Sequence, residues 1–329
     1  MPDIALLLVV AATQGCSLGP KIFALVFALV FALVFALVYA LVYALVYALV
    51  YALEAIGAAP LVASSTSSNR SGGAMPAQSN DLLATRREYR SPGEAPIDPS
   101  ETLASVLRHL RDTVPERTVV AVRDGDGFED RPARWFVAEV EELARGLIGA
   151  GVSAGDRVAV HSATRVEFTL VDYAIWMVGA VTVPLYETSS AEQIAWILAD
   201  SGARVLISED ERLAALHRSV ADRTPACRHV FVIEEHGFET LKEFGDAVLP
   251  AELHARTIAV RQTDIATIVY TSGTTGNAKG CILTHRNLLW DAVQVAEAGR
   301  GFLVPGSRTL LFLPLAHIFA RVIQVTCIR

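Results

Sequence analysis

A stretch rich in glycine and hydroxyl side chains, residues 270–280, reads Y-T-S-G-T-T-G-N-A-K-G. These residue types suit a polyphosphate, because glycine lets backbone N–H groups approach the oxygens and hydroxyls donate further hydrogen bonds. Lys279 adds a flexible positive charge. The stretch is not a Walker A loop, since Lys279 follows Ala278 and precedes glycine instead of serine or threonine. An apolar strand predicted over residues 265–270 leads into it, so we interpret it as a phosphate-binding loop and not as a polar surface turn.

The elements before this loop alternate between short apolar runs and helical patterns. Strands are predicted over residues 118–122, 157–160, 181–183, 204–207 and 230–233, and helices over 103–110, 136–147, 166–179 and 191–200. Pro184 is expected to end one strand and Gly202 to close one helix. Nearly continuous apolar strands between helices are typical of an α/β fold, with a parallel-rich sheet flanked by helices.

Residues 270–280 resemble the phosphate loop of the adenylate-forming (AMP-binding) enzymes, Y-T-S-G-T-T-G-x-P-K-G. The match fails only at Ala278, where proline is usual. We expect alanine to loosen the loop without removing a phosphate ligand. The resemblance implies that the β- and γ-phosphates of ATP are bound by Thr271, Ser272, Gly273, Thr274, Thr275, Gly276 and Lys279. We expect Lys279→Ala to weaken catalysis strongly in a complete enzyme and Ala278→Pro to leave it active.

Two further stretches support the same resemblance. Residues 313–321, L-P-L-A-H-I-F-A-R, are similar to the family segment that contributes to the acyl and adenylate pocket. There His317 would help to place the substrate carboxylate or gate the acyl tunnel. A histidine in an apolar run can instead be a core residue satisfied by the backbone. Residues 183–198 are similar to long-chain acyl-CoA synthetases, and we interpret them as a structural strand end and helix that indicate lineage.

The resemblance implies a long-chain fatty acid–CoA ligase. In that reaction the fatty acid carboxylate attacks the α-phosphate of ATP, with Mg²⁺ screening the charge, and gives acyl-AMP; coenzyme A then displaces AMP. Positioning and charge stabilisation would account for most of the rate enhancement. Two alternatives stay open: an aryl or medium-chain acyl-CoA ligase or acyl-AMP ligase, and a non-catalytic, membrane-anchored fragment that binds nucleotide or a partner.

The resemblance covers residues 99–329, the first part of the large N-terminal domain of an adenylate-forming enzyme. The family's adenine-binding segment, its magnesium-binding glutamate and its small C-terminal domain have no counterpart before Arg329. We therefore expect a partial AMP-binding domain that is inactive alone. A second sheet would begin near Ile265 and be incomplete, leaving apolar side chains at the surface. No metal ligands are predicted in the chain.

The N-terminus carries a low-complexity hydrophobic repeat. Residues 23–54 repeat FALV and then YALV. As a helix they would span about 48 Å, beyond a hydrocarbon core of about 30 Å, and the aromatic side chains would mark no single face. The repeat is either a spurious translation, with Met75 as the functional start, or a single-pass membrane helix. Residues 1–22 are an apolar leader that makes a poor signal peptide, and residues 55–98 are expected to be a disordered linker.

Charge and cysteine content exclude several classes of protein. The net charge is −7, without a basic stripe, so we expect no nucleic-acid partner. The four cysteines are scattered, which disfavours a zinc site or a disulfide scaffold and suits a reducing compartment. We expect a cytoplasmic protein or one peripheral at the cytoplasmic face of the membrane, with possible membrane contact through residues 23–54.

Overall fold

The computed structural model describes residues 95–329, except residues 126, 272–276 and 301–302. All of the described residues lie within one unit, Glu88–Arg329. The predictions for the leader, the hydrophobic repeat and most of the linker concern residues outside the described ones. No helix within the described ranges is both long enough and apolar enough to cross a membrane.

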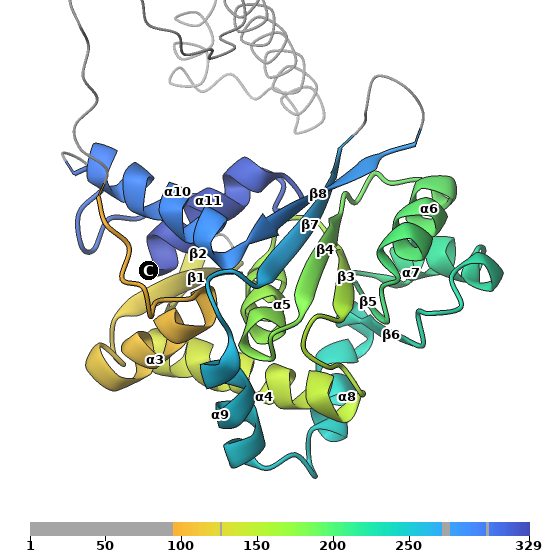
Figure 1. The fold of residues 1–329 in the computed structure, drawn as a ribbon, viewed down its shortest axis with the longest axis horizontal. Helices are drawn as coiled ribbons and strands as arrows, with labels where there is room; N and C mark the ends of the chain where they lie inside the picture. The colour runs from red at the N-terminus through yellow and green to blue at the C-terminus, as the bar shows by residue number, and fades with distance from the viewer. Residues whose placement is uncertain (1–94, 126, 272–276, 301–302) are drawn as a thin grey trace, which may run out of the picture. The chain divides into compact units, whose positions relative to one another are not determined.

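A six-stranded sheet organises this unit (Figure 1). Its strand order is β6-β5-β3-β4-β7-β8, and every neighbouring pair is parallel except β7 and β8 at one edge. The strands are β3 (Arg157–His161), β4 (Val181–Leu185), β5 (Val205–Ser208), β6 (His229–Val232), β7 (Ile265–Thr271) and β8 (Lys279–Thr284). The predicted α/β fold with a parallel-rich sheet is confirmed.

Helices cover both faces of the sheet. The helices are α3 (Leu103–Thr113), α4 (Ala133–Gly149), α5 (Val166–Met177), α6 (Ala191–Ser201), α7 (Glu211–Arg218), α8 (Gly237–Phe244), α9 (Pro250–Ala259), α10 (His285–Ala298) and α11 (Ile318–Ile328), with short 3₁₀ turns at Ala221–Arg223 and Ile233–Glu235. Helices α4, α5 and α8 share the larger apolar cluster, and α6 packs in a separate cluster with other side chains of the sheet. Helix α5 lies between the sheet and α4, so residues 168–177 are all buried. The aromatic rings of Phe136, Tyr173 and Trp176 meet edge to face inside the larger cluster.

The structure corrects two details of the sequence prediction. Pro184 does not end β4 but lies within it, opposite Val160 of β3. On the other side β4 pairs with β7 only at Thr182, so the missing N–H of Pro184 interrupts no further ladder there. The strand that starts at Ile265 does not open a second sheet; it adds to the main sheet beside β4.

The second sheet is small and lies elsewhere in the chain. It is the antiparallel hairpin of β1 (Thr118–Asp124) and β2 (Gly127–Pro132). Apolar side chains are exposed at Ile282 on the edge strand β8, at Leu310 and Phe312 before α11, and at Phe319 on α11.

Helix α6 has well-defined ends, which matter for the site described below. Ser190 caps its first turn, and Ser190 and Gln193 exchange side chain-to-backbone hydrogen bonds in a capping box. Gly202 ends the helix as predicted, with a positive φ of 63° that favours glycine. The side chains of Ile194 and Leu198 are buried against the sheet.

Candidate functional site

The predicted phosphate loop connects the two strands of an antiparallel hairpin. Thr271 ends β7 and Lys279 begins β8, and the register places these two residues opposite each other. Both residues are exposed. Ser272, Gly273, Thr274, Thr275 and Gly276 lie outside the described residues. The structure therefore brings together two of the predicted phosphate ligands, Thr271 and Lys279, at the carboxyl end of a strand.

Gly280, the last residue of the motif, makes room for a neighbouring ring. A Cβ atom at Gly280 would lie 2.7 Å from Cγ2 of Ile268 and 3.2 Å from Cζ of Tyr270. Both distances are shorter than an ordinary van der Waals contact. Glycine fits here because the side chains of Ile268 and Tyr270 occupy the space that a Cβ atom would need.

His317 caps the N-terminus of α11. Its Nδ1 accepts a hydrogen bond of 3.2 Å from the backbone N–H of Phe319, and its side chain is exposed. His317 is therefore not a buried core histidine. Because Nδ1 acts as an acceptor, the neutral ring carries its proton on Nε2, which can donate a hydrogen bond.

A buried ion pair fixes the helix that His317 caps. Nη2 of Arg321 on α11 donates to Oδ1 of Asp172 on α5 at 2.9 Å, and both side chains are fully buried. Nε2 of Gln324 donates to the other carboxylate oxygen of Asp172 at 3.3 Å. The guanidinium of Arg321 also lies 5.3 Å from the centre of the Trp176 ring. These contacts tie the first turns of α11 to the core.

A cavity of about 330 Å³ lies at the carboxyl ends of β3 and β4. The connections that leave these adjacent strands go to opposite faces of the sheet, through α5 and α6, and such a divergence leaves a crevice. The cavity is lined by Ser162, Ala163, Thr164, Tyr186, Glu187, Thr188, Leu311, Phe312, Pro314 and Ala316. Oγ1 of Thr164 donates to the carbonyl of Leu313 at 2.7 Å and accepts from the N–H of Leu315 at 3.0 Å. The predicted pocket segment 313–321 is thus held at this edge of the sheet.

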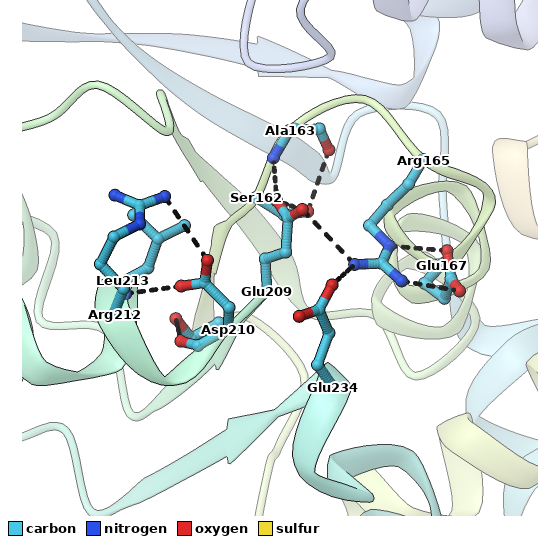
Figure 2. Close-up of polar contacts among 10 residues, drawn as sticks. Ser162, Ala163, Arg165, Glu167, Glu209, Asp210, Arg212, Leu213 and Glu234 are labelled. Carbon is cyan, nitrogen blue, oxygen red and sulfur yellow. Dashed lines mark hydrogen bonds and ion pairs between the residues drawn. The ribbon is translucent and has the colours of Figure 1, made fainter.

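Figure 2 shows a network of hydrogen bonds and ion pairs that includes Ser162 and Ala163, two of the residues lining this cavity. The carboxylate of Glu209, just after β5, accepts from the N–H of Ala163 at 2.7 Å and from the hydroxyl of Ser162 at 3.2 Å. Arg165 makes two hydrogen bonds to Glu167, of 2.9 and 3.1 Å, and a third of 3.1 Å to Glu234. These hydrogen bonds raise the pKa of Arg165 above its ordinary value, although burial opposes the change.

Sequence reasoning missed this network because its members lie far apart in the chain and match no motif. Their common feature is position, since Ser162, Glu209 and Glu234 all follow the ends of parallel strands. Within the described ranges, no three histidine, cysteine, aspartate or glutamate residues are grouped so that they could hold a metal ion.

Comparison with known proteins identifies the protein family of this chain. The AMP-binding enzyme family matches residues 114–328. The chain belongs to the AMP-binding enzyme family. It is 43% identical over 244 residues to the long-chain-fatty-acid–CoA ligase FadD15 of Mycobacterium tuberculosis, covering 73% of this chain and 40% of that protein. It is 30% identical over 223 residues to the human long-chain-fatty-acid–CoA ligase 1, covering 61% of this chain and 32% of the relative.

Solved structures agree on the fold. A long-chain-fatty-acid-CoA ligase (FadD1) from Archaeoglobus fulgidus superposes with a TM-score of 0.60 at 23% identity, covering 73% of this chain and 47% of that one. The N-terminal domain of FACL13 from Mycobacterium tuberculosis gives a TM-score of 0.56 at 24% identity, with coverage of 69% and 55%. The chain thus spans well under two thirds of the length of these relatives.

Proposed function

We propose that this chain supplies the phosphate-binding part of a long-chain fatty acid–CoA ligase, which converts a fatty acid to acyl-AMP and then to acyl-CoA. The observation that carries the proposal is the motif of residues 270–280 on the β7–β8 hairpin, with Lys279 opposite Thr271. The substrate class is supported by the 43% identity to proteins described as long-chain-fatty-acid–CoA ligases.

In the proposed reaction a carboxylate oxygen of the fatty acid attacks the α-phosphorus of ATP. The bond from this phosphorus to the bridging oxygen breaks, and pyrophosphate leaves with the electron pair. The thiolate of coenzyme A then attacks the acyl carbon of acyl-AMP, and AMP departs. Lys279, with the hydroxyls and backbone N–H groups of residues 271–276, would bind the β- and γ-phosphates and stabilise the charge that develops on them. His317 would donate from Nε2 to the substrate carboxylate.

The proposed reaction uses Mg²⁺ by family resemblance. The described residues do not fit a protein-held magnesium site, because no cluster of carboxylates faces the end of the β7–β8 hairpin. We therefore assign none of these residues as a magnesium ligand.

The test of the phosphate assignment is nucleotide binding. We expect the purified chain to bind MgATP in isothermal titration calorimetry, and Lys279→Ala to weaken binding at least about 10-fold, as loss of a charge-assisted contact does. Lys242→Ala on α8 is the matched control, because it removes another lysine, which pairs with Glu139 and Glu142 of α4. Equal MgATP affinity in Lys279→Ala and the unaltered chain would refute the assignment.

We further propose a cytoplasmic location or one peripheral at the cytoplasmic face of the membrane. The scattered cysteines support the reducing compartment. Membrane contact through residues 23–54 is testable by carbonate extraction of cell membranes: retention of the chain, and its release when residues 1–74 are deleted, would support an anchor. Release of the full chain by carbonate would argue against it.

A further inference from the structure

One helix contacts both arms of the hairpin that carries the phosphate motif. Nε1 of Trp196 on α6 donates a hydrogen bond of 2.8 Å to the carbonyl of Ala278, immediately before β8. The hydroxyl of Tyr270, near the end of β7, donates at 2.6 Å to Oδ2 of Asp200. Trp196 and Asp200 are four residues apart, so they lie on the same side of α6. Both ends of the loop are thus tied to one rigid element.

The hydrogen bond from Tyr270 to Asp200 is partly buried and is made to a carboxylate oxygen. Tyr270 belongs to the same apolar cluster as Ile194 and Leu198 of α6. Burial and the hydrogen bond to the Asp200 carboxylate both raise the pKa of Tyr270 above its ordinary value, so the phenol stays protonated and remains a donor. A hydrogen bond to a charged acceptor is stronger than one between neutral groups. This contact holds the first arm of the hairpin.

The contact at Ala278 falls on the one position where the motif departs from its family pattern. A proline there restricts the backbone directly, because its ring fixes φ. Alanine does not, but the Ala278 carbonyl is held from outside by the indole N–H of Trp196. The Ala278 side chain also packs against the cluster that contains Leu198 and Tyr270. A tertiary hydrogen bond therefore acts where the covalent restraint is missing.

We propose that Trp196 and Asp200 are positioning residues of the nucleotide site: they hold the two ends of the phosphate loop, and Trp196 compensates for alanine at residue 278. The proposal rests on the proposed function of that loop. Helix α6 is a suitable anchor, because its first turn is capped by Ser190, its last turn is closed by Gly202, and its inner face is buried. Helix α6, which begins within the stretch 183–198 that we interpret from the sequence as structural, thereby gains a role in binding.

The experiment compares variants of the 329-residue chain by MgATP titration and by hydrogen–deuterium exchange of the β8 amides. Trp196→Phe removes the indole donor and keeps an aromatic ring, and Tyr270→Phe removes only the hydroxyl. We expect each to weaken MgATP binding about 3- to 10-fold, the effect of one hydrogen bond, and to speed exchange at residues 279–284. Trp290→Phe on α10 is the matched control: Trp290 is 38% exposed, against 37% for Trp196, and should show neither effect.

Two combinations separate positioning from a general loss of stability. Ala278→Pro added to Trp196→Phe should restore MgATP affinity to within about 2-fold of the unaltered chain, because proline supplies the restraint again. Trp196→Phe added to Lys279→Ala should cause no further loss of MgATP affinity, because the loop has already lost its main phosphate contact. A merely structural role for Trp196 predicts no rescue and additive losses.

The outcomes distinguish the two proposals. If Lys279→Ala weakens binding but Trp196→Phe and Tyr270→Phe bind MgATP as the unaltered chain does, the positioning role is wrong and the phosphate-binding function stands. If Lys279→Ala has no effect, the phosphate-binding function fails, and the positioning role fails with it.

Discussion

The ion pair between Asp172 and Arg321 joins α5 to α11 and is fully buried, so removing one partner tests how α11 is held in place. Replacing Arg321 by methionine keeps much of the side-chain volume and removes the charge. The carboxylate of Asp172 then remains in the core with Gln324 as its remaining side-chain donor on α11. Breaking a buried pair in this way costs about 3–5 kcal/mol of the free energy of unfolding. A domain with a total of about 5–15 kcal/mol would lose a large part of its stability.

The pH dependence of the stability lost in Arg321→Met follows from the protonation state of Asp172. Burial raises the pKa of Asp172 above its ordinary value even beside Arg321, whose charge acts in the opposite direction. Without Arg321 the pKa rises further. A carboxyl with a raised pKa in the folded state contributes stability at low pH that is lost as the pH rises through the folded-state pKa. The Arg321→Met variant should therefore show a smaller deficit at pH 5 than at pH 8.

The assay is urea unfolding followed by tryptophan fluorescence, since Trp176 lies beside the pair. Asp172→Asn combined with Arg321→Met should recover at least half of the loss, because no charge is left buried. Arg111→Met is the matched control: Arg111 pairs with Asp112 and Glu141 at the surface, and its loss should cost less than about 1 kcal/mol. The reasoning is refuted if Arg321→Met costs no more than this control or if the double variant is no more stable than the single one.

Two further predictions concern other sites. Gly280→Ala should destabilise the chain by about 1–3 kcal/mol in urea unfolding, because the added methyl group overlaps Ile268 and the Tyr270 ring; an unchanged free energy would show that the ring moves freely. Burial lowers the pKa of His161 from 6.5 to about 4, so the free energy of unfolding should fall by about 2 kcal/mol between pH 7.5 and pH 5 through this residue. His161→Leu should remove that part of the pH dependence of the free energy of unfolding, whereas His109→Leu at the surface should not. An equal change in the free energy of unfolding with pH in the two variants would contradict the argument.

Local patterns were enough to predict most of the fold. The apolar runs at β3, β5 and β6 and the amphipathic pattern of α4 depend on burial periodicity, which the chain carries residue by residue. The end of α6 was predicted because a left-handed residue at a helix terminus favours glycine, and Gly202 has that conformation. Family membership was predicted mainly from residues 270–280, with support from residues 313–321 and 183–198, because few other loops combine that strand, those glycines and that lysine.

Other features depended on which strands become neighbours. Pro184 looked like a strand end because proline lacks an N–H, but the sparse pairing between β4 and β7 lets the strand continue. The strand at Ile265 looked like the start of a new sheet because its partner, β4, is far away in sequence. The helices α7 to α11 were not predicted, since their apolar faces matter only against the elements on which they pack.

The sequence by itself thus determined the fold class, the family and the chemistry expected of residues 271–279, because these follow from residue type and local spacing. Only the tertiary structure decided what supports that chemistry. It set Lys279 opposite Thr271 in the β7–β8 hairpin. It also formed four contacts between distant parts of the chain: Trp196 with Ala278, Tyr270 with Asp200, Arg321 with Asp172, and Ala163 with Glu209. The pair of Lys279 and Thr271 is local to one hairpin. Each of the other contacts joins residues whose separation in the chain carries no signal, and each depends on the directions in which the connections leave the parallel strands.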